Sequence, residues 1–193
     1  MVNYSITYKG RPVTKSMYKI NFNSKTLSCE ISDLVIDFSP HNGWTFNIES
    51  DCTIKTGDDC TFNTRSNCTF NTGHECTFNT GWNCNFKTHE RCNFKAGRHC
   101  TFKTGWNCIF ETRDYCTFKT GDGCTFETNG GCTFNTGGFC TFNTGECCCF
   151  LIHNFNTKKF KTYDDISVIV DMVDDKRYLL TKDLIKLTKI ITG

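Results

Sequence analysis

The central part of the chain alternates apolar and polar positions within a unit that repeats at every eighth position. In the typical unit, C-T-F-N-T-G-x-x, the alternation points Cys, Phe and the second Thr to one face. Cys begins a unit at every eighth position from 52 to 148, which gives (148 − 52)/8 + 1 = 13 copies, and Trp44 begins one more. A period of eight matches neither the α-helical nor the coiled-coil period, so the repeat predicts short strands and excludes a helix. We therefore expect an all-β fold, a parallel β-solenoid with an apolar interior.

Each unit is expected to supply a short strand followed by a turn. The sixth residue is Gly in most copies, and the exceptions include Arg65, His89, Arg113 and Asn129. We expect this position to be a turn that needs positive φ. The expected structural core follows the inward positions and includes Cys60, Phe62, Cys76, Phe78, Cys100, Phe102, Cys124 and Phe126.

The number of units per coil has two solutions, because a 24-residue coil of three units (a triangular prism) and a 16-residue coil of two units (a flattened sandwich) both bury Cys and Phe. A 24-residue coil places Lys87 under Glu111 and Lys103 under Glu127, although one like-charged pair remains. A 16-residue coil stacks Lys87, Lys103 and Lys119 in one row and places Glu111 over Glu127 in another. Since adjacent like charges are destabilising, the pattern favours the 24-residue coil, with the 16-residue coil as the alternative.

The two ends of the chain depart from the repeat. Alternating apolar residues near the N-terminus predict a β-rich cap, which protects the first coil from end-to-end pairing. After the repeat, Ile166–Val173 and Arg177–Leu180 predict a hairpin, and Lys182–Ile191 predicts a closing helix. The expected segments are an N-terminal β cap (1–43), the octapeptide-repeat solenoid (44–155) and a small C-terminal ββα module (156–193).

The composition of the chain argues against several kinds of partner and site. The net charge is 22 − 20 = +2, which argues against a nucleic-acid partner, and the chain has neither a signal-type N-terminus nor a run of about 18 apolar residues. The 16 cysteines lack the close pairs of a zinc site, and we interpret them as reduced structural thiols, with one thiol of Cys147, Cys148 and Cys149 exposed. We thus expect no metal, no cofactor, no membrane and a cytoplasmic location, which is a reducing compartment.

The side chains that differ most between repeat units lie in the turns. No nucleophile, P-loop or dinucleotide motif is present, so we expect no enzyme and no catalytic residues. A 24-residue coil stacks Trp82 and Trp106 on one corner, either as partner anchors or folded back over their own rungs. The other candidates for partner binding would gather near another corner: Arg65, His89, Arg91, Arg113 and Tyr115.

The units CTFNTG, CTFKTG and CTFETG resemble an uncharacterised Cys-Thr-Phe octapeptide-repeat family of phages and large DNA viruses. This resemblance implies a solenoid and a viral source, with the cytoplasm of a host cell or a virion as the location, and it supplies no activity. More loosely, Cys followed two places later by Phe is similar to the inward pair of pentapeptide-repeat proteins, some of which mimic DNA. Here Lys is at least as common as Glu on the outer face, which departs from that pattern.

These observations favour a non-enzymatic structural or protein-interaction scaffold, viral in origin, whose protein partner is not identified. Self-association through the solenoid end or the C-terminal module is part of this hypothesis. Two alternatives belong to other classes. A DNA-mimic inhibitor of a nucleic-acid enzyme predicts a continuous negative stripe, and an ice-binding protein predicts a flat array of Thr, which is otherwise simply a good strand residue.

Overall fold

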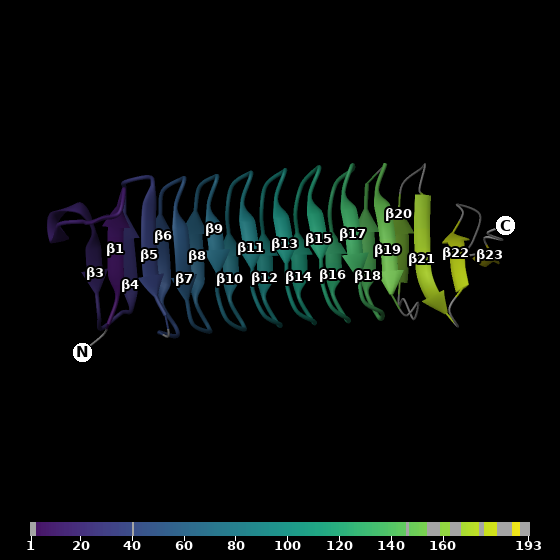
Figure 1. Cartoon of the computed structure of the whole chain (residues 1–193), viewed down its shortest axis with the longest axis horizontal. Coiled ribbons are helices and arrows are strands. Elements are labelled where there is room, and N and C mark those ends of the chain that lie inside the picture. The colour runs from purple at the N-terminus through teal and green to yellow at the C-terminus, as the bar shows by residue number, and fades with distance from the viewer. Residues whose placement is uncertain are drawn as a thin grey trace.

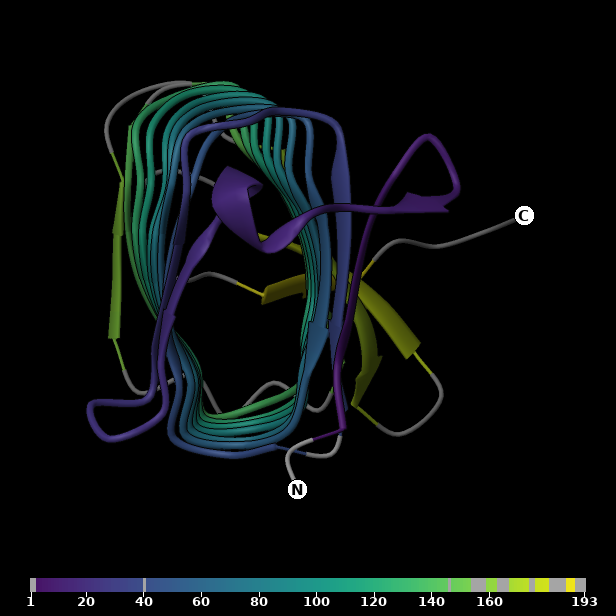
Figure 2. The same cartoon turned by 90° about the vertical axis from the view of Figure 1, so that its left-hand side faces the viewer.

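The chain forms a parallel β-solenoid in which two sheets face each other across a narrow core (Figures 1 and 2). The structure, a computed structural model, describes residues 3–39, 41–145, 147–153, 159–162, 167–173, 176–180 and 187–189. Viewed along its axis, the coil has two long sides that carry the strands and two short sides that carry the turns (Figure 2). The solenoid predicted from the octapeptide repeat is thus confirmed.

Strands alternate between the two sheets along the repeat. In spatial order, sheet A contains β2 (Arg11–Pro12), β1 (Ser5–Tyr8), β5 (Leu34–Phe38), β7 (Thr53–Thr56), β9 (Thr69–Asn71), β11 (Asn85–Lys87), β13 (Thr101–Lys103), β15 (Thr117–Lys119), β17 (Thr133–Thr136), β19 (Cys149–His153), β21 (Ser167–Val173), β22 (Lys176–Leu180) and β23 (Leu187–Lys189). Sheet B contains β3 (Lys19–Asn21), β4 (Thr26–Cys29), β6 (Thr45–Ile48), β8 (Thr61–Thr64), β10 (Thr77–Asn79), β12 (Asn93–Lys95), β14 (Ile109–Glu111), β16 (Thr125–Glu127), β18 (Thr141–Thr144) and β20 (Lys159–Thr162). One short 3₁₀ helix, η1 (Lys15–Met17), precedes β3.

The coil contains two repeat units, and the preference for a 24-residue coil is wrong. Phe102 in β13 pairs in parallel register with Phe86 and Phe118, so neighbouring coils are offset by two units (118 − 102 = 16). As a result Lys103 does lie between two lysines, Lys87 and Lys119, on the outer face of sheet A. Exposed like charges cost only about 0.2–1 kcal/mol per pair, which is less than the packing of the aromatic core supplies.

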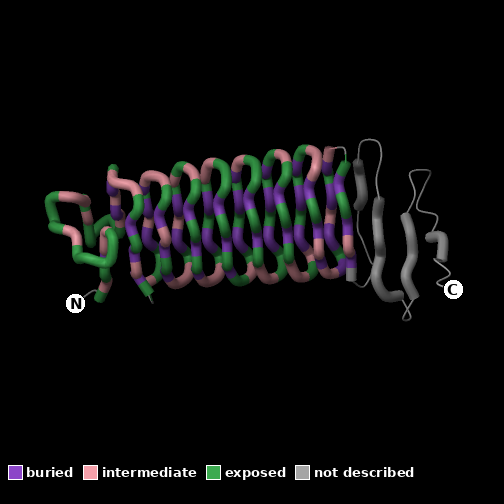
Figure 3. The backbone as a smooth tube through the Cα atoms, turned by 45° about the horizontal axis from the view of Figure 1, so that its top comes forward, coloured by how far each residue is buried: buried purple, intermediate pink, exposed green. Residues whose placement is uncertain are grey.

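The core consists of two ladders of Phe rings, one from each sheet. Phe94 stacks on Phe78 and Phe110 within its own sheet, with centroids 4.8 and 4.9 Å apart and planes within 4°. It meets Phe86 and Phe102 of the opposite sheet edge-to-face, at 5.3 and 5.2 Å and 76°. Both are favoured geometries for aromatic pairs. Buried and exposed positions therefore alternate along every coil (Figure 3), and all eight residues expected in the core are buried.

An aromatic cluster covers the N-terminal end of the two ladders. Tyr4 stacks on Phe38 at 4.8 Å, and Phe38 contacts the buried indole of Trp44 at 5.0 Å. The strands outside this cluster are antiparallel, β1 against β5 and β3 against β4. Parallel pairing already begins with β4 on β6 and β5 on β7, inside the segment expected as the cap.

The C-terminal part of the chain continues sheet A. β21 adds to β19 in parallel, and β22 and β23 then follow in antiparallel pairing. The helix expected over Lys182–Ile191 is wrong at Leu187–Lys189, where β23 pairs with β22, and its other residues lie outside the described ones. Pairing with an open sheet edge satisfies backbone groups that a separate helix would leave exposed at that edge. No helix in the described residues is long and apolar enough to cross a membrane.

Candidate functional site

The turns between sheets form two rows along opposite sides of the solenoid, visible as the two borders in Figure 1. We call the turns that lead from sheet B to sheet A the BA edge, and those that lead from sheet A to sheet B the AB edge. The BA edge comprises residues 49–52, 65–68, 81–84, 97–100, 113–116 and 129–132. The AB edge comprises residues 57–60, 73–76, 89–92, 105–108, 121–124 and 137–140.

In each turn the residue with positive φ is the one before Cys, which is the eighth residue of the unit. The expectation that the sixth residue needs positive φ is therefore wrong. Asn, which tolerates this conformation, is frequent at the eighth position, but bulky side chains such as Tyr115 and Phe139 adopt it too, at φ 57°. The residues concerned are Asp51, Asp59, Asn67, Glu75, Asn83, Arg91, His99, Asn107, Tyr115, Gly123, Gly131, Phe139 and Cys147.

Glycine at the sixth position is explained by close approach of successive coils. A Cβ atom on Gly97 would lie 2.9 Å from the carbonyl carbon of Gly81 in the coil before, and one on Gly137 would collide with the Asp122 carboxylate. That carboxylate accepts a hydrogen bond from the backbone N–H of Gly138 at 2.9 Å. The turns are therefore stacked as tightly as the strands.

The 16-residue coil divides the predicted partner-binding residues between the two edges. Trp82 and Trp106 do not share a corner: their separation (106 − 82 = 24) is three units, or one and a half coils, so they lie on opposite edges. Both side chains are half exposed, at 52% and 47%. The expected corner cluster is likewise split, with Arg65, Arg113 and Tyr115 beside Trp82 on the BA edge, and His89 and Arg91 beside Trp106 on the AB edge.

On the BA edge the predicted residues contact different neighbours. Arg65 forms an ion pair with Glu49 of the preceding coil, Nε to Oε2 at 2.9 Å. The ring of Tyr115 stacks on His99, with centroids 5.2 Å apart. Arg113 lines a shallow groove that Glu111 and Glu127 also line. These contacts spread along the edge and do not converge on one point.

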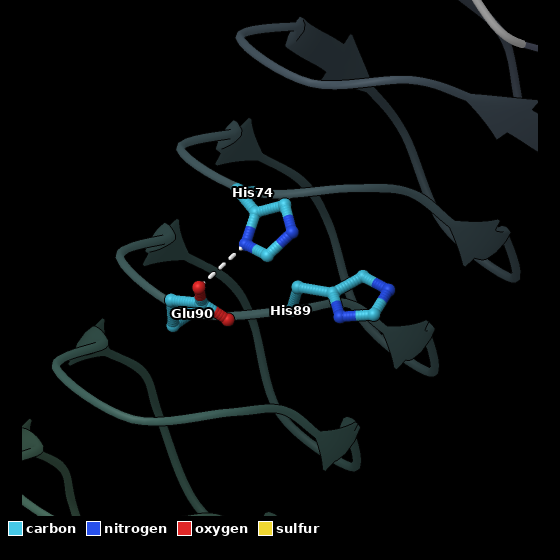
Figure 4. A group of neighbouring side chains, drawn as sticks. All are labelled: His74, His89 and Glu90. Carbon is cyan, nitrogen blue, oxygen red and sulfur yellow. Dashed lines mark ion pairs between the residues drawn. The ribbon is translucent and has the colours of Figure 1, made fainter.

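On the AB edge three side chains do converge. His74, from one turn, directs Nδ1 to the Glu90 carboxylate of the next turn at 2.8 Å, and its ring stacks on His89 at 4.6 Å (Figure 4). Arg91, the next residue along, pairs with Glu75 through Nε and Oε1 at 2.7 Å. The AB edge therefore gathers imidazole and carboxylate groups on two consecutive coils.

Further along the AB edge, Trp106 and Phe139 line one groove of about 640 Å³. Both rings are 47% exposed, and Gly121, Asp122 and Gly123 of the intervening coil line the groove between them. Gly123 occupies the eighth position of its unit, and the equivalent residues of the neighbouring turns on this edge are Asn107 and Phe139. Because Gly123 has no side chain, the groove is open between them. The Asp122 carboxylate supplies a negative charge there.

His74, Glu90, Asp122 and Phe139 of these sites were not among the predicted candidates. His74 and Glu90 are separated by two repeat units (90 − 74 = 16), so they become neighbours only in a two-unit coil. Phe139 is the one aromatic, besides Tyr115, at the eighth position of a unit, and this break in the repeat is the signal that could have identified it.

The cysteines contribute to packing. Cys100 directs its thiol to the carbonyl oxygens of Gly81 and Arg98, both at 3.6 Å, and thus covers polar backbone in the turn. Burial raises the pKa of Cys52 to about 11, because desolvation disfavours the thiolate. Cys147 and Cys149 are exposed on either side of a buried Cys148, so two thiols of this run face outward instead of the expected one.

Comparisons with protein-family models, with curated proteins and with solved structures find no match to this chain.

Proposed function

We propose that this protein is a non-enzymatic interaction scaffold that binds a partner protein at the AB edge. There, Trp106 and Phe139 contact a cationic side chain of the partner. The observation that carries the proposal is the groove between these two half-exposed rings, with the Asp122 carboxylate in its lining. The solenoid supplies a rigid frame that holds the two rings two coils apart.

The two rings are not required by the fold. Buried Phe and Cys side chains complete the core of these coils, whereas Trp106 and Phe139 leave about half of their surface in water. Large aromatic side chains are typical anchors of protein interfaces because they bury much area at a small cost in side-chain entropy. Their exposure supports a contact with a partner.

The chemistry of the groove favours a Lys or Arg side chain as its occupant. A cation near an aromatic face is attracted by the negative face of the ring, and this attraction grows when water is excluded. Asp122 adds an opposite charge, and one of its carboxylate oxygens is already oriented by the N–H of Gly138. A partner segment with a basic residue flanked by apolar residues would match these features.

The outer faces of the sheets argue against the two alternative functions. Lys87, Lys103 and Lys119 form a positive row on sheet A, where a DNA mimic requires negative charge. The same long side chains stand beside the row of Thr that an ice-binding surface would need to keep flat.

The experiment is selection of peptides from a displayed random library on the full-length protein, followed by measurement of the dissociation constants of the selected peptides. We expect peptides with a central Lys or Arg, and at least tenfold weaker binding by Trp106→Ala. Trp82→Ala is the matched control, because that indole is about equally exposed on the opposite edge.

A second variant, Gly123→Asn, fills the groove without removing an aromatic ring. Asn is compatible with positive φ, and Asn83 already stacks on Asn67 at the equivalent position, with Nδ2 to Oδ1 at 2.9 Å. A Cβ at Gly123 would collide with the side-chain oxygen of Asn107, so that amide must rotate away. We therefore expect a small decrease in melting temperature and loss of peptide binding. Selected peptides without a basic residue, or equal losses for Trp82→Ala and Trp106→Ala, would refute the proposal.

A further inference from the structure

His74, His89 and Glu90 place two imidazoles and a carboxylate together on the AB edge, and we propose that they bind a divalent transition-metal ion of the zinc class. One potential ligand atom from each residue lies within 4.8 Å of the others. It is the only group of this kind in the part of the chain that the structure describes. The proposal is independent of the aromatic groove.

The backbone holds all three residues in place. The N–H of His74 donates to the Asp58 carboxylate at 2.8 Å, and the carbonyl of Glu90 accepts from the N–H of Glu75 at 3.1 Å. His89 donates its N–H to the carbonyl of Gly73 at 3.3 Å in the coil before. Ligands on such a stacked backbone start close to their final positions, which lowers the entropic cost of metal binding.

The side chains must rearrange to hold the ion. Nitrogen and oxygen ligands bind zinc at about 2.0–2.2 Å, so in a tetrahedral site they lie about 3.3–3.5 Å apart. Here the Nδ1 of His74 and the Glu90 carboxylate are closer, at 2.8 Å, and all three ligand atoms lie within 4.8 Å of one another. The two imidazole planes differ by 25°, and a metal lies in the plane of each ring that binds it. His89 is exposed and can rotate to meet the ion, and the contact between the Nδ1 of His74 and the Glu90 carboxylate would be replaced by a bond from each group to the ion (Figure 4).

The donor set selects the class of ion. Imidazole suits zinc, copper and nickel, whereas calcium and magnesium prefer sites built from oxygen. The cationic side chain at the next position, Arg91, is paired with Glu75 and leaves the carboxylate of Glu90 to the ion. Three protein ligands leave one position of a tetrahedral ion to water.

The test is calorimetric titration of the full-length protein with Zn²⁺ in a Cys147→Ser/Cys149→Ser background, which removes the two exposed thiols as competing ligands. We expect saturable binding of one equivalent. His74→Ala and His89→Ala should each weaken binding at least tenfold. His99→Ala is the control, because His99 also stacks on an aromatic ring, that of Tyr115, but on the opposite edge.

Titration with Co²⁺ identifies the ligands independently of affinity. A nitrogen and oxygen site gives ligand-field absorption without a sulfur-to-metal charge-transfer band, and circular dichroism of each variant verifies that the solenoid is intact. Absence of saturable Zn²⁺ binding overturns the proposal. So does binding that His89→Ala leaves unchanged, or that carries the sulfur band.

Discussion

Removal of one Phe ring from the middle of the ladder should destabilise the solenoid strongly. Phe102 is fully buried and stacks on Phe86 and Phe118 at 4.7 and 4.9 Å. It also meets Phe94 and Phe110 edge-to-face, each at 5.2 Å. Phe→Ala substitutions in packed cores cost about 3–5 kcal/mol, and aromatic pairs contribute about 0.5–1.5 kcal/mol each beyond buried area. With four such pairs, we expect Phe102→Ala to cost about 5 kcal/mol, the upper end of that range.

Urea denaturation measures this loss. With a dependence of about 2–3 kcal/mol per molar urea, a loss of about 5 kcal/mol lowers the midpoint by about 2 M. Far-UV circular dichroism and tryptophan fluorescence should be followed together, since coincident transitions are the condition for comparing free energies of unfolding.

The control for this substitution is Thr101→Ala on the same strand. Thr101 is exposed and points away from the core, so the change tests strand propensity alone and should cost less than about 1 kcal/mol. If Phe102→Ala costs no more than Thr101→Ala, the facing Phe ladders do not hold the two sheets together.

Two further predictions concern charge. Lys103→Glu should raise the free energy of unfolding by about 0.2–1 kcal/mol for each of the two lysine pairs that it relieves. Lys95→Glu should lower the free energy of unfolding, because Lys95 pairs with Glu111 at 2.8 Å. Urea denaturation at low and at high salt checks both signs, and salt should screen both effects. The pKa of Cys52 is about 11 in the folded protein, against an ordinary 9.0. As pH rises, the unfolded chain therefore loses this proton before the folded protein does. The contribution of this thiol to the free energy of unfolding is thus complete below about pH 9 and is lost as pH rises toward 11. Cys52→Ala should therefore show a shallower decline of stability over this range than the wild type, and equal slopes would contradict the assignment.

The octapeptide repeat was sufficient to predict strand formation and the inward face. Cys60 and Phe62 are buried because alternation with a period of two leaves no other way to separate their unit's apolar and polar positions. The same alternation does not say how many strands complete one coil. The charges on the outer face indicated the wrong coil, since exposed pairs such as Lys87 and Lys103 cost little.

The grouping of residues into candidate sites depended on the number of strands in one coil. In a 16-residue coil His74 lies beside Glu90, and Trp82 and Trp106 move to opposite edges. In a 24-residue coil each of these relations changes, although no residue changes its inward or outward direction. Candidate residues were therefore recognisable one by one, but their grouping was not.

Sequence alone determined that this chain builds a stacked β-structure with Cys and Phe inside, because the period and the alternation act within a single strand and its turn. Only the tertiary structure decided the coil, and with it which turns are neighbours. The physical reason is that coil size is set by how inward side chains from different strands fill the interior. Phe rings from two facing sheets interlock edge-to-face while stacking along each sheet, an arrangement that no property of one octapeptide specifies.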